Sequence, residues 1–582
     1  MTESVEPAAP RALKAPRSPL LFGSLRGYRR QWLPRDLVAG LTVWAVLVPE
    51  ALAYATIAGV SPVIGLYAAP AALVLYAAFG SSRHLVTGPM AATAALSAAA
   101  VASVAGDGDP TQLTIVLALL TGVIALLAGI LRLGFVANFI SEPVLKGFII
   151  GLALVIIVGQ VPKLFGIEPA DGNFFEKLWG WVRALGDTHN LTLFVGVVSL
   201  VIVVGLRRFL PAIPGSLVAV AFGIAAVAVF DLDDRGVAIV GEIDAGLPAL
   251  GLPDVAIADY LALAGAAVGV MLIGFAEGLG AAKTYATRNH YEIDPNRELL
   301  GLGAANLGAG LSSGMVVNGS LSKTAVNGAA GAMTQLSGII VAALTVVTLL
   351  FLTGLFSDLP EATLAAIVVA ALIELVDFGA LVDLYRTYTT GLGRIYGIAA
   401  RPDFIAAVAA MAGVLIFDTL PGLFIGIGIS MLLLLYRTAR PHIAELGELT
   451  DSPGSYADID RSAATEPVAG IVVLRVESGV FFANADHVRR TITQSVSGGS
   501  ARAVILDGET MPFVDVTAVR MLVEVADDLA SEGVGFAIAG GIGQVRDVVR
   551  TGTAGRGPAM YPTLQQAIAA LDGGHIDQRP GS

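Results

Sequence analysis

Two short stretches decide the fold of this chain, residues 86–94 (VTGPMAATA) and residues 317–325 (VNGSLSKTA). They resemble each other, and each interrupts a long apolar run with residues that break a helix. A second pair of similar stretches lies upstream of them, residues 49–55 (PEALAYA) and residues 276–282 (AEGLGAA). Paired helix breaks at matching places in two halves of a chain point to the central binding site of a membrane transporter.

The composition is typical of a membrane protein. Of 582 residues, 55% are hydrophobic and only 14% are charged, whereas ordinary globular domains carry about 25% charged residues. The apolar residues form runs of about 20, the length that crosses a bilayer core of ~30 Å. The net charge of −12 argues against nucleic-acid binding, which needs a basic surface. Because the chain has no cysteine, disulfides, thiol catalysis and cysteine-bound metals are excluded.

The apolar runs predict about fourteen membrane helices, several of them too short to cross a bilayer alone. Such short helices are acceptable only where protein, not lipid, surrounds their free backbone groups. The predicted helices lie near residues 36–56, 62–79, 87–105, 111–131, 138–161, 193–206, 216–230, 259–282, 297–311, 319–332, 334–355, 361–376, 403–417 and 421–436.

The positive charges predict the orientation of these helices, because cytoplasmic loops of membrane proteins carry an excess of Lys and Arg. Alternate loops are basic here, and the loop that holds Lys163, Lys177 and Arg183 is the exception. We expect a multi-pass protein of the plasma or inner membrane, with both termini in the cytoplasm and no cleavable signal peptide. The supporting basic residues are Arg26, Arg29, Arg30, Arg35, Arg83, Arg132, Arg207, Arg208, Lys283, Arg288, Arg297, Arg386, Arg394, Arg401, Arg437 and Arg440.

The membrane region gives way to a small soluble domain. Three apolar runs in this domain predict buried strands, at residues 471–476, 503–507 and 535–540, and residues 519–525 have helical spacing. Alternating strands and helices predict a sheet with helices packed on it. The expected parts of the chain are an N-terminal segment 1–35, a membrane domain 36–440 with repeats at about 36–230 and 259–437, a polar linker 441–466, and a soluble domain 467–572.

The two breaks are suited to binding an anion. Gly88-Pro89 removes a backbone donor and fixes φ, so that a helix can start there but cannot continue through. Gly319-Ser320 places a flexible residue before a hydroxyl that can cap a helix. Each helix start leaves unpaired N–H groups, and its dipole adds about half a positive charge. Lys323 would add a full charge to this site. The alternative is that these residues only kink packed helices.

Two acids lie deep inside apolar runs, Glu50 and Glu277. A carboxylate in mid-membrane costs about 2.5–3.5 kcal/mol on insertion scales, so it is usually retained for function. Both residues are candidate proton carriers, although a structural hydrogen bond to a helix backbone is the alternative for each. Tyr54 lies one helical turn after Glu50, where it either lines the site or packs as an ordinary aromatic residue.

No motif indicates an enzyme, a cofactor site or a metal site. His84, His290 and His442 lack the spacing of metal ligands, and no serine, histidine and acid arrangement suggests a hydrolase. Gly301 and Gly303 resemble part of a nucleotide-binding loop, but they lie in an apolar run and fit close helix packing better. We therefore predict that the chain is not an enzyme, has no catalytic residue and binds no cofactor.

From residue 35 to about 555 the chain resembles the sulfate permease (SulP) family of anion transporters. Residues 36–55, residues 65–67 (GLY) and residues 319–327 (GSLSKTAVN) carry the resemblance. It implies a polytopic α-helical membrane protein with a seven-plus-seven inverted repeat and two half-helices. Its core domain would hold the substrate, and its gate domain would carry the interface of a homodimer. It also implies a substrate site made by Glu50, Tyr54, Gly88, Pro89, Met90, Ala91, Ser320, Leu321, Ser322 and Lys323, with Glu277 close by.

The soluble part resembles a STAS domain, the cytoplasmic α/β regulatory module of this family. Asp515 and Thr517 stand where relatives have a regulatory turn, and Thr517 matches a position that is phosphorylated in some of them. Val516 and Ala518 depart from the pattern, which favours a plain helix-capping role for Asp515. A cytoplasmic regulatory partner of this domain is the other expectation.

Departures from the family pattern bear on coupling and selectivity. Many relatives carry glutamine at the position of Glu50 and arginine at that of Lys323, and a lysine cannot clamp an oxyanion with two parallel hydrogen bonds. Sodium-coupled relatives place a hydroxyl where this chain has Ala281, which offers sodium no oxygen. We therefore expect proton symport through Glu277 and Glu50.

The leading hypothesis is a secondary active transporter of sulfate or a similar small inorganic anion in a lipid membrane, which works by alternating access. A transporter or exchanger of bicarbonate or a dicarboxylate is the alternative of the same kind. A membrane sensor that signals through its STAS domain is an alternative of another class. A nucleobase permease would require hydrogen-bonding side chains in place of Ser320 and Lys323, and we do not favour it.

Overall fold

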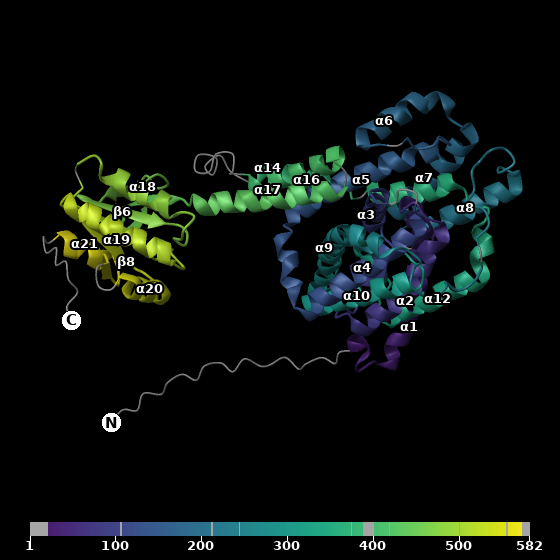
Figure 1. Cartoon of the computed structure of the whole chain (residues 1–582), viewed down its shortest axis with the longest axis horizontal. Helices are drawn as coiled ribbons and strands as arrows, with labels where there is room; N and C mark the ends of the chain where they lie inside the picture. Colours follow the sequence, from purple (N-terminus) through teal and green to yellow (C-terminus); the bar gives the residue numbers. More distant parts are fainter. Residues whose placement is uncertain are drawn as a thin grey trace. The chain divides into compact units, whose positions relative to one another are not determined.

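The computed structural model describes residues 21–104, 108–170, 172–210, 213–243, 245–373, 375–387, 401–417, 419–499, 501–553 and 557–572. The chain forms two compact units. The first comprises Met1–Tyr385 and Asp403–Ile429, and the second comprises Arg386–Pro402 and Ser430–Ser582. The first unit is almost entirely helical, and the second carries a sheet with helices on it (Figure 1).

The first half of the helical unit holds eight helices and one short strand within the described residues. The first break, predicted from Gly88-Pro89, separates this strand from the helix that follows it. The elements are α1 (Leu33–Ile57), α2 (Pro62–Phe79), β1 (Val86–Gly88), α3 (Ala91–Ala102), α4 (Pro110–Ile130), α5 (Glu142–Leu164), α6 (Phe174–Arg183), α7 (Asn190–Phe209) and α8 (Gly215–Phe230), with 3-10 turns η3 (Leu133–Phe139) and η4 (Ala184–Asp187).

The second half repeats this order, with a long helix, a second helix, a short strand and a short helix. The strand ends at Ser320, which is the second predicted break. Its described elements are α9 (Ile257–Arg288), α10 (Pro295–Leu311), β2 (Asn318–Ser320), α11 (Leu321–Ala329), α12 (Leu336–Val347) with the turns η5 (Thr348–Leu352) and η6 (Thr353–Phe356), α13 (Glu361–Ile373), α14 (Phe378–Arg386), α16 (Pro402–Phe417) and α17 (Thr419–Ala439).

Each range that the sequence predicts as a membrane helix contains a helix. Nine helices in the described residues are long and apolar enough to cross a membrane, and α3, α8 and α16 are shorter apolar helices. Helices α6 and α14 are unexpected, because both are short and carry charges that make their segments resemble loops. The protein is therefore a polytopic α-helical membrane protein, as predicted.

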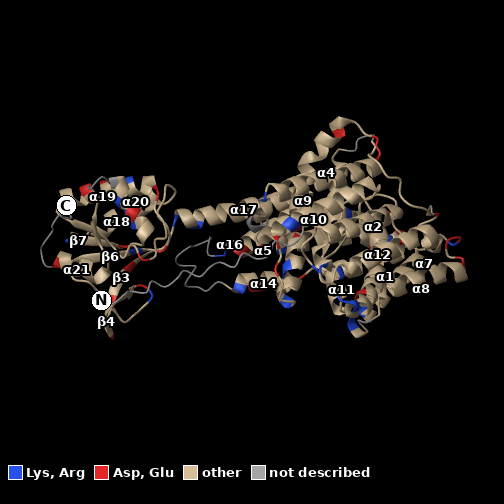
Figure 2. Cartoon of the chain, turned by 90° about the horizontal axis from the view of Figure 1, so that it is seen from below, with Lys and Arg blue, Asp and Glu red and all other residues tan. Residues whose placement is uncertain are grey.

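Charged residues are rare in the middle of the helical unit. Figure 2 shows Lys, Arg, Asp and Glu mainly at the ends of its helices and in the turns, whereas the helix interiors are nearly free of them. Several helices begin with proline, which needs no hydrogen-bond acceptor at that position. Asp109 and Asp294 cap α4 and α10 by accepting backbone N–H groups of the first turn.

Glycines allow the helices of the two halves to pack closely. Helices α4 and α10 cross where Gly122 and Gly303 face each other's backbone. A Cβ atom on Gly303 would lie 2.7 Å from the backbone nitrogen of Leu126, and one on Gly122 would lie 2.7 Å from that of Leu307. Gly80, the C-terminal cap of α2, lies equally close to α10, because a Cβ atom on Gly301 would lie 2.8 Å from its Cα. These glycines of α10 thus serve helix packing, as the sequence indicates, and not nucleotide binding.

The second unit is an α/β domain. Its sheet has the order β4-β3-β6-β7-β8-β9, with β5 paired to β3, and the strands from β6 to β9 are parallel. The predicted strands are confirmed as β6, β7 and β8, and the predicted helical stretch lies within α19. The elements are β3 (Ile443–Leu449), β4 (Ser452–Asp458), β5 (Thr465–Pro467), β6 (Ile471–Val476), α18 (Ala485–Val496), β7 (Ala503–Asp507), α19 (Val516–Ser531), β8 (Gly535–Ala539), α20 (Gly543–Thr553), β9 (Ala559–Tyr561) and α21 (Leu564–Asp572).

The segment 441–466, expected to be a polar linker, differs from that expectation. It forms β3 and β4 and the start of β5, and β3 pairs directly with β6 of the sheet. Strand β4 forms one edge of the sheet and has no fully buried residue. A strand that is solvated on one face lacks a continuous apolar run, which is why composition alone suggests a linker.

Candidate functional site

The two helix breaks lie side by side. Strands β1 and β2 pair in antiparallel register, with Val86 opposite Ser320 and Gly88 opposite Asn318. Helix α3 starts just beyond one end of this pair, and helix α11 starts just beyond the other. Their N-termini therefore converge on one short two-stranded sheet, and the two helices leave it from opposite ends. The antiparallel pairing is the arrangement expected of an inverted repeat.

The two half-helices begin differently. Ser320 caps α11, and its Oγ accepts a hydrogen bond from the backbone N–H of Lys323 at 3.2 Å. Met90 occupies the corresponding position before α3 and makes no side-chain cap. The first N–H groups of α3 are therefore not occupied by a capping side chain, and these groups are suited to an anionic ligand.

Lys323 joins the two halves of the site. Its Nζ lies 2.8 Å from Oε2 of Glu50 on α1 and donates a hydrogen bond to the carbonyl oxygen of Pro89 at 3.0 Å. The same ammonium lies 5.0 Å from the ring centre of Tyr54, within the range of a cation–π contact. The Lys323 side chain is only 1% exposed, and that of Glu50 is 10% exposed.

This geometry changes the electrostatics expected from the sequence. The sequence suggests that Lys323 adds an unbalanced positive charge, but Glu50 neutralises it in this conformation. The carboxylate of Glu50 is thus the anionic partner of Lys323 in this conformation. Because both charges are largely removed from water, loss of either partner would leave an uncompensated buried charge.

Glu277 contacts the second break through a residue that the sequence analysis did not select. Its Oε2 accepts a hydrogen bond from Nδ2 of Asn318 at 3.3 Å, and Oδ1 of Asn318 accepts one from the backbone of Gly319 at 2.7 Å. Gly274 and Gly278 of α9 make room for Asn318, since a Cβ on either would lie within 3.3 Å of its side chain. The sequence did carry a signal for Asn318, since a side-chain amide directly before the Gly-Ser break in an apolar run is unusual.

The remaining predicted binding residues differ in exposure. Gly88 and Pro89 are buried, and Ala91 is nearly so, whereas Met90 is half-buried. Leu321 and Ser322 are exposed, and Oγ of Ser322 lies 3.1 Å from that of Ser320. The first turn of α11 is thus open at Leu321 and Ser322, where backbone N–H groups and the Ser322 hydroxyl offer polar contacts to an anion.

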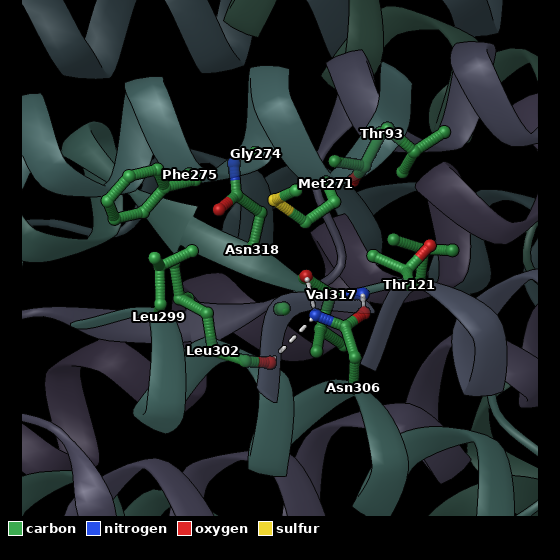
Figure 3. A pocket seen from close by; sticks show the side chains of 13 residues that line it. Thr93, Thr121, Met271, Gly274, Phe275, Leu299, Leu302, Asn306, Val317 and Asn318 are labelled. Carbon is green, nitrogen blue, oxygen red and sulfur yellow. Dashed lines mark hydrogen bonds between the residues drawn. The ribbon is translucent and has the colours of Figure 1, made fainter. Parts of the chain in front are cut away.

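A small cavity of about 10 Å³ lies beside β2 (Figure 3). Thr93 of α3, Thr121 of α4, Met271 of α9 and Asn306 of α10 are among the residues that line it. It has room for about one water molecule and is too small for a polyatomic anion. The Nδ2 of Asn306 donates to the carbonyl oxygens of Leu302 and Val317 at 2.9 Å, so that Asn306 holds the chain that enters β2.

Two further buried acids escaped the sequence analysis. Glu298 of α10 accepts hydrogen bonds from the hydroxyls of Tyr76 and Ser81, both at 2.6 Å, and from two backbone N–H groups. Asp36 of α1 accepts the backbone N–H groups of Met333 and Thr334 and the Thr334 hydroxyl. Both carboxylates tie elements of one half to elements of the other, and both lie near helix ends, where acids look like ordinary loop residues.

In the second unit, Asp515 caps α19. Its Oδ1 accepts the backbone N–H of Ala518 at 2.8 Å, and its Oδ2 accepts that of Phe482 at 2.9 Å. Thr517 is exposed in the first turn of this helix. Val516, which precedes it in the chain, is 66% exposed, and Phe482, whose backbone N–H binds Asp515, is 73% exposed. The turn is therefore held by Asp515 and leaves the Thr517 hydroxyl accessible.

Paired half-helices that begin on one two-stranded sheet beside buried acids define a class of membrane transport proteins built from inverted repeats. The chain belongs to the sulfate permease family, whose model matches residues 33–396, and a STAS domain model matches residues 462–567. The resemblance inferred from the sequence is thereby confirmed. Membership indicates a transporter.

Relatives and solved structures agree with this assignment. The chain is 37% identical over 519 residues to a protein of Mycobacterium tuberculosis (strain H37Rv) named a probable sulfate transporter, covering 88% of this chain and 90% of the relative. It is 32% identical over 546 residues to the chloroplastic sulfate transporter 4.1 of Arabidopsis thaliana, covering 89% and 76%.

Two solved structures share the fold. Murine Slc26a9, an anion transporter in the inward-facing state, superposes with a TM-score of 0.85 at 22% identity, covering 95% of this chain and 94% of that one. The transmembrane domain of the cyanobacterial bicarbonate transporter BicA gives 0.58 at 23% identity, covering 68% and 98%. At these identities the likeness establishes the fold alone.

Proposed function

We propose that this protein is a secondary active transporter that carries sulfate or a similar small anion across the cell membrane. The observation that carries the proposal is the buried contact of Lys323 with Glu50 and Pro89, at the place where both half-helices begin. A lysine, two helix N-termini and serine hydroxyls form a set of donors that fits an oxyanion. The names of the sulfate-transporting relatives agree with this choice.

In the proposed mechanism the anion replaces Glu50 as the partner of Lys323. The oxyanion would accept hydrogen bonds from the Nζ of Lys323, from the free N–H groups at the start of α3 and from the hydroxyl of Ser322. Tyr54 would stay in contact with the ammonium and limit the space around it. A single lysine holds an oxyanion without the planar fit of an arginine, which suits several small anions of similar shape.

Proton coupling follows from the same exchange. When Glu50 takes up a proton, its carboxyl no longer neutralises Lys323, and the site gains a positive charge that favours an anion. When the anion leaves, Glu50 can release its proton and pair with Lys323 again. Glu277, held by Asn318, is the second proposed carrier. Its neighbour Ala281 presents no oxygen to sodium, which favours protons as the coupling ion.

The movement that exposes the site to either side is alternating access. The site is built from α1, β1, α3, α9, β2 and α11, which would form the moving core. The gate would contain α5, α7, α8 and the later helices, would carry the dimer interface, and would stay fixed in the membrane. With both termini in the cytoplasm, as the positive charges predict, the STAS domain would face the cytoplasm and any regulatory partner there.

The experiment that tests the proposal is uptake into liposomes. The purified protein, reconstituted with a known orientation, is given radiolabelled sulfate with and without an inward proton gradient, and bicarbonate and succinate are tested in parallel. Accumulation of sulfate that depends on the gradient supports the proposal. Uptake of none of these anions, or uptake that rises with external sodium at fixed pH, would overturn the corresponding part of it.

A membrane sensor that signals through its STAS domain is the second candidate, and the exposed position of Thr517, next to the exposed apolar residue Val516, favours it. Because β3 pairs with β6, a truncation at residue 467 would cut through the sheet, and removal of residues 441–582 is the cleaner test. A transporter should retain flux after this deletion. A sensor should lose its output while showing no flux in either form.

A further inference from the structure

Helix α6 (Phe174–Arg183) has no place in the transport scheme. It is too short to cross a bilayer and lies between the ends of α5 and α7, two of the helices long and apolar enough to span. Its start is well defined, because the side chains and backbones of Asn173 and Glu176 cap each other. A segment that merely joins two spans would not need such a cap, so the helix is a feature in its own right.

One face of α6 is apolar and exposed. Phe175, Trp179 and Val182 are 54%, 57% and 41% exposed, and their spacing places them on the same side of the helix. Leu185, in the turn η4 that follows, is 40% exposed. Three bulky apolar side chains on one face of a ten-residue helix require a covering surface, because water would solvate them poorly.

The other face of α6 ties it to the ends of the two spans. The ring of Trp181 packs edge-on against that of Phe165, immediately after α5, with centroids 5.4 Å apart. The backbone N–H of His189, immediately before α7, donates to the carbonyl oxygen of Phe165 at 2.9 Å. Figure 1 shows α6 next to α5 and α7. The helix is therefore held at the level where these spans leave the membrane.

Polar groups lie beside the apolar face in the manner of a helix at a membrane surface. The guanidinium of Arg183 stands over the ring of Trp179, 5.0 Å from its centre. Tryptophan is enriched at bilayer interfaces, and arginine there extends its charge toward water while its stem covers apolar surface. Lys177 and Arg183 are balanced by Glu176 and by Asp187 of η4, so α6 and η4 together carry no net charge.

We propose that α6 is an interfacial helix, which lies in the headgroup region of the bilayer with Phe175, Trp179 and Val182 inserted between lipid chains. Its ligand is the phospholipid surface in general, because the balanced charges give no preference for anionic headgroups. Through Phe165 the helix anchors the ends of α5 and α7 at a constant depth. This inference is independent of which anion the protein carries.

The absence of cysteine from the chain allows a direct test with the full-length protein. Single variants Phe175→Cys and Trp179→Cys are labelled with an environment-sensitive fluorophore in phosphatidylcholine nanodiscs. The matched control is Asp234→Cys, an exposed position in the turn after α8. Nitroxide carried on the lipid near the headgroup should quench both α6 labels several-fold more than the control label, and iodide in the buffer should show the reverse order.

Two results would overturn the proposal. Strong iodide quenching of both α6 labels without lipid quenching would place the apolar face in water. Crosslinking of the Phe175→Cys or Trp179→Cys protein into dimers, without lipid quenching, would show that a second copy covers this face. Trp179→Phe gives a check without a label, because quenching of intrinsic fluorescence by brominated lipid should fall in this variant, and no fall would contradict insertion of Trp179.

Discussion

The Nζ of Lys323 lies 2.8 Å from Oε2 of Glu50, and neither side chain is more than 10% exposed. Lys323 lies on α11 and Glu50 on α1, so the contact links the two halves of the inverted repeat. A buried ion pair of this kind contributes little net stability. Removing only one partner, however, lowers the stability strongly, because the other charge is left buried without a partner. This asymmetry leads to the first two predictions.

Lys323→Gln leaves the carboxylate of Glu50 without its partner. We expect a loss of about 3–5 kcal/mol in the free energy of unfolding at neutral pH, together with loss of anion uptake. Thermal unfolding in detergent measures the first effect, and liposome flux measures the second. The double variant Lys323→Gln with Glu50→Gln should recover most of the stability but none of the transport. Recovery of transport in the double variant would exclude Lys323 from substrate binding.

Glu50→Gln removes the group that competes with the anion for Lys323. The variant should bind sulfate more tightly than the wild type, by about tenfold or about 1.4 kcal/mol, and should no longer accumulate it in response to a proton gradient. Equilibrium binding and gradient-driven uptake are the two measurements. Glu50→Asp, which keeps the charge, is the matched control and should retain coupling. Unchanged gradient-driven accumulation in Glu50→Gln would refute the exchange mechanism.

Glu277→Gln should abolish coupled uptake while the protein remains folded, because the amide cannot carry a proton yet can still bond to Asn318. Counterflow of sulfate, measured at equal pH on both sides of the membrane, needs sulfate binding but no proton gradient. It should persist in Glu277→Gln, which separates loss of coupling from loss of binding. Ala281→Ser tests the companion idea about sodium by adding the missing hydroxyl. If Glu277→Gln accumulates sulfate as the wild type does, Glu277 has no part in coupling.

Gly303→Val should destabilise the helical unit by about 1–3 kcal/mol or more, since a Cβ on Gly303 already lies 2.7 Å from a backbone nitrogen of α4. Gly205→Val in α7 is the control, because nothing lies within 4 Å of a Cβ at that position. Unfolding midpoints of the two variants in the same detergent give the comparison. Equal midpoints would contradict the close crossing of α4 and α10.

Asp515→Ala removes the cap of α19 together with the bond to the backbone of Phe482. A loss of about 0.5–2 kcal/mol in the stability of the STAS domain is expected. Limited proteolysis of the full-length protein should cut the 481–517 region faster, while sulfate flux stays close to that of the wild type. Asp515→Asn retains one capping oxygen, so its proteolysis rate should lie between those of the wild type and Asp515→Ala. A large loss of flux in Asp515→Ala would instead indicate that this turn regulates transport.

The features that could be predicted from the sequence are those that local patterns of residues determine. Apolar length predicts the membrane helices, and the Gly-Pro and Gly-Ser pairs predict both breaks, because these signals are contained in the residues themselves. Helix α6 was not predicted, since ten residues that include three charged ones resemble a loop. The strands β3 to β5 escaped it because a strand that is solvated on one face has no continuous apolar run. Asn318 and Glu298 depend on partners far away in the chain, which no local pattern shows.

The sequence by itself determined that this is a membrane protein with two similar halves, that each half carries a broken helix, and that it belongs among the sulfate permeases. Only the tertiary structure decided that Lys323 and Glu50 are partners and that Asn318 connects Glu277 to the second break. Hydrophobic length and helix breaking are properties of neighbouring residues along the chain. The charge balance of a buried site depends on groups hundreds of residues apart, and folding alone brings them within hydrogen-bonding distance.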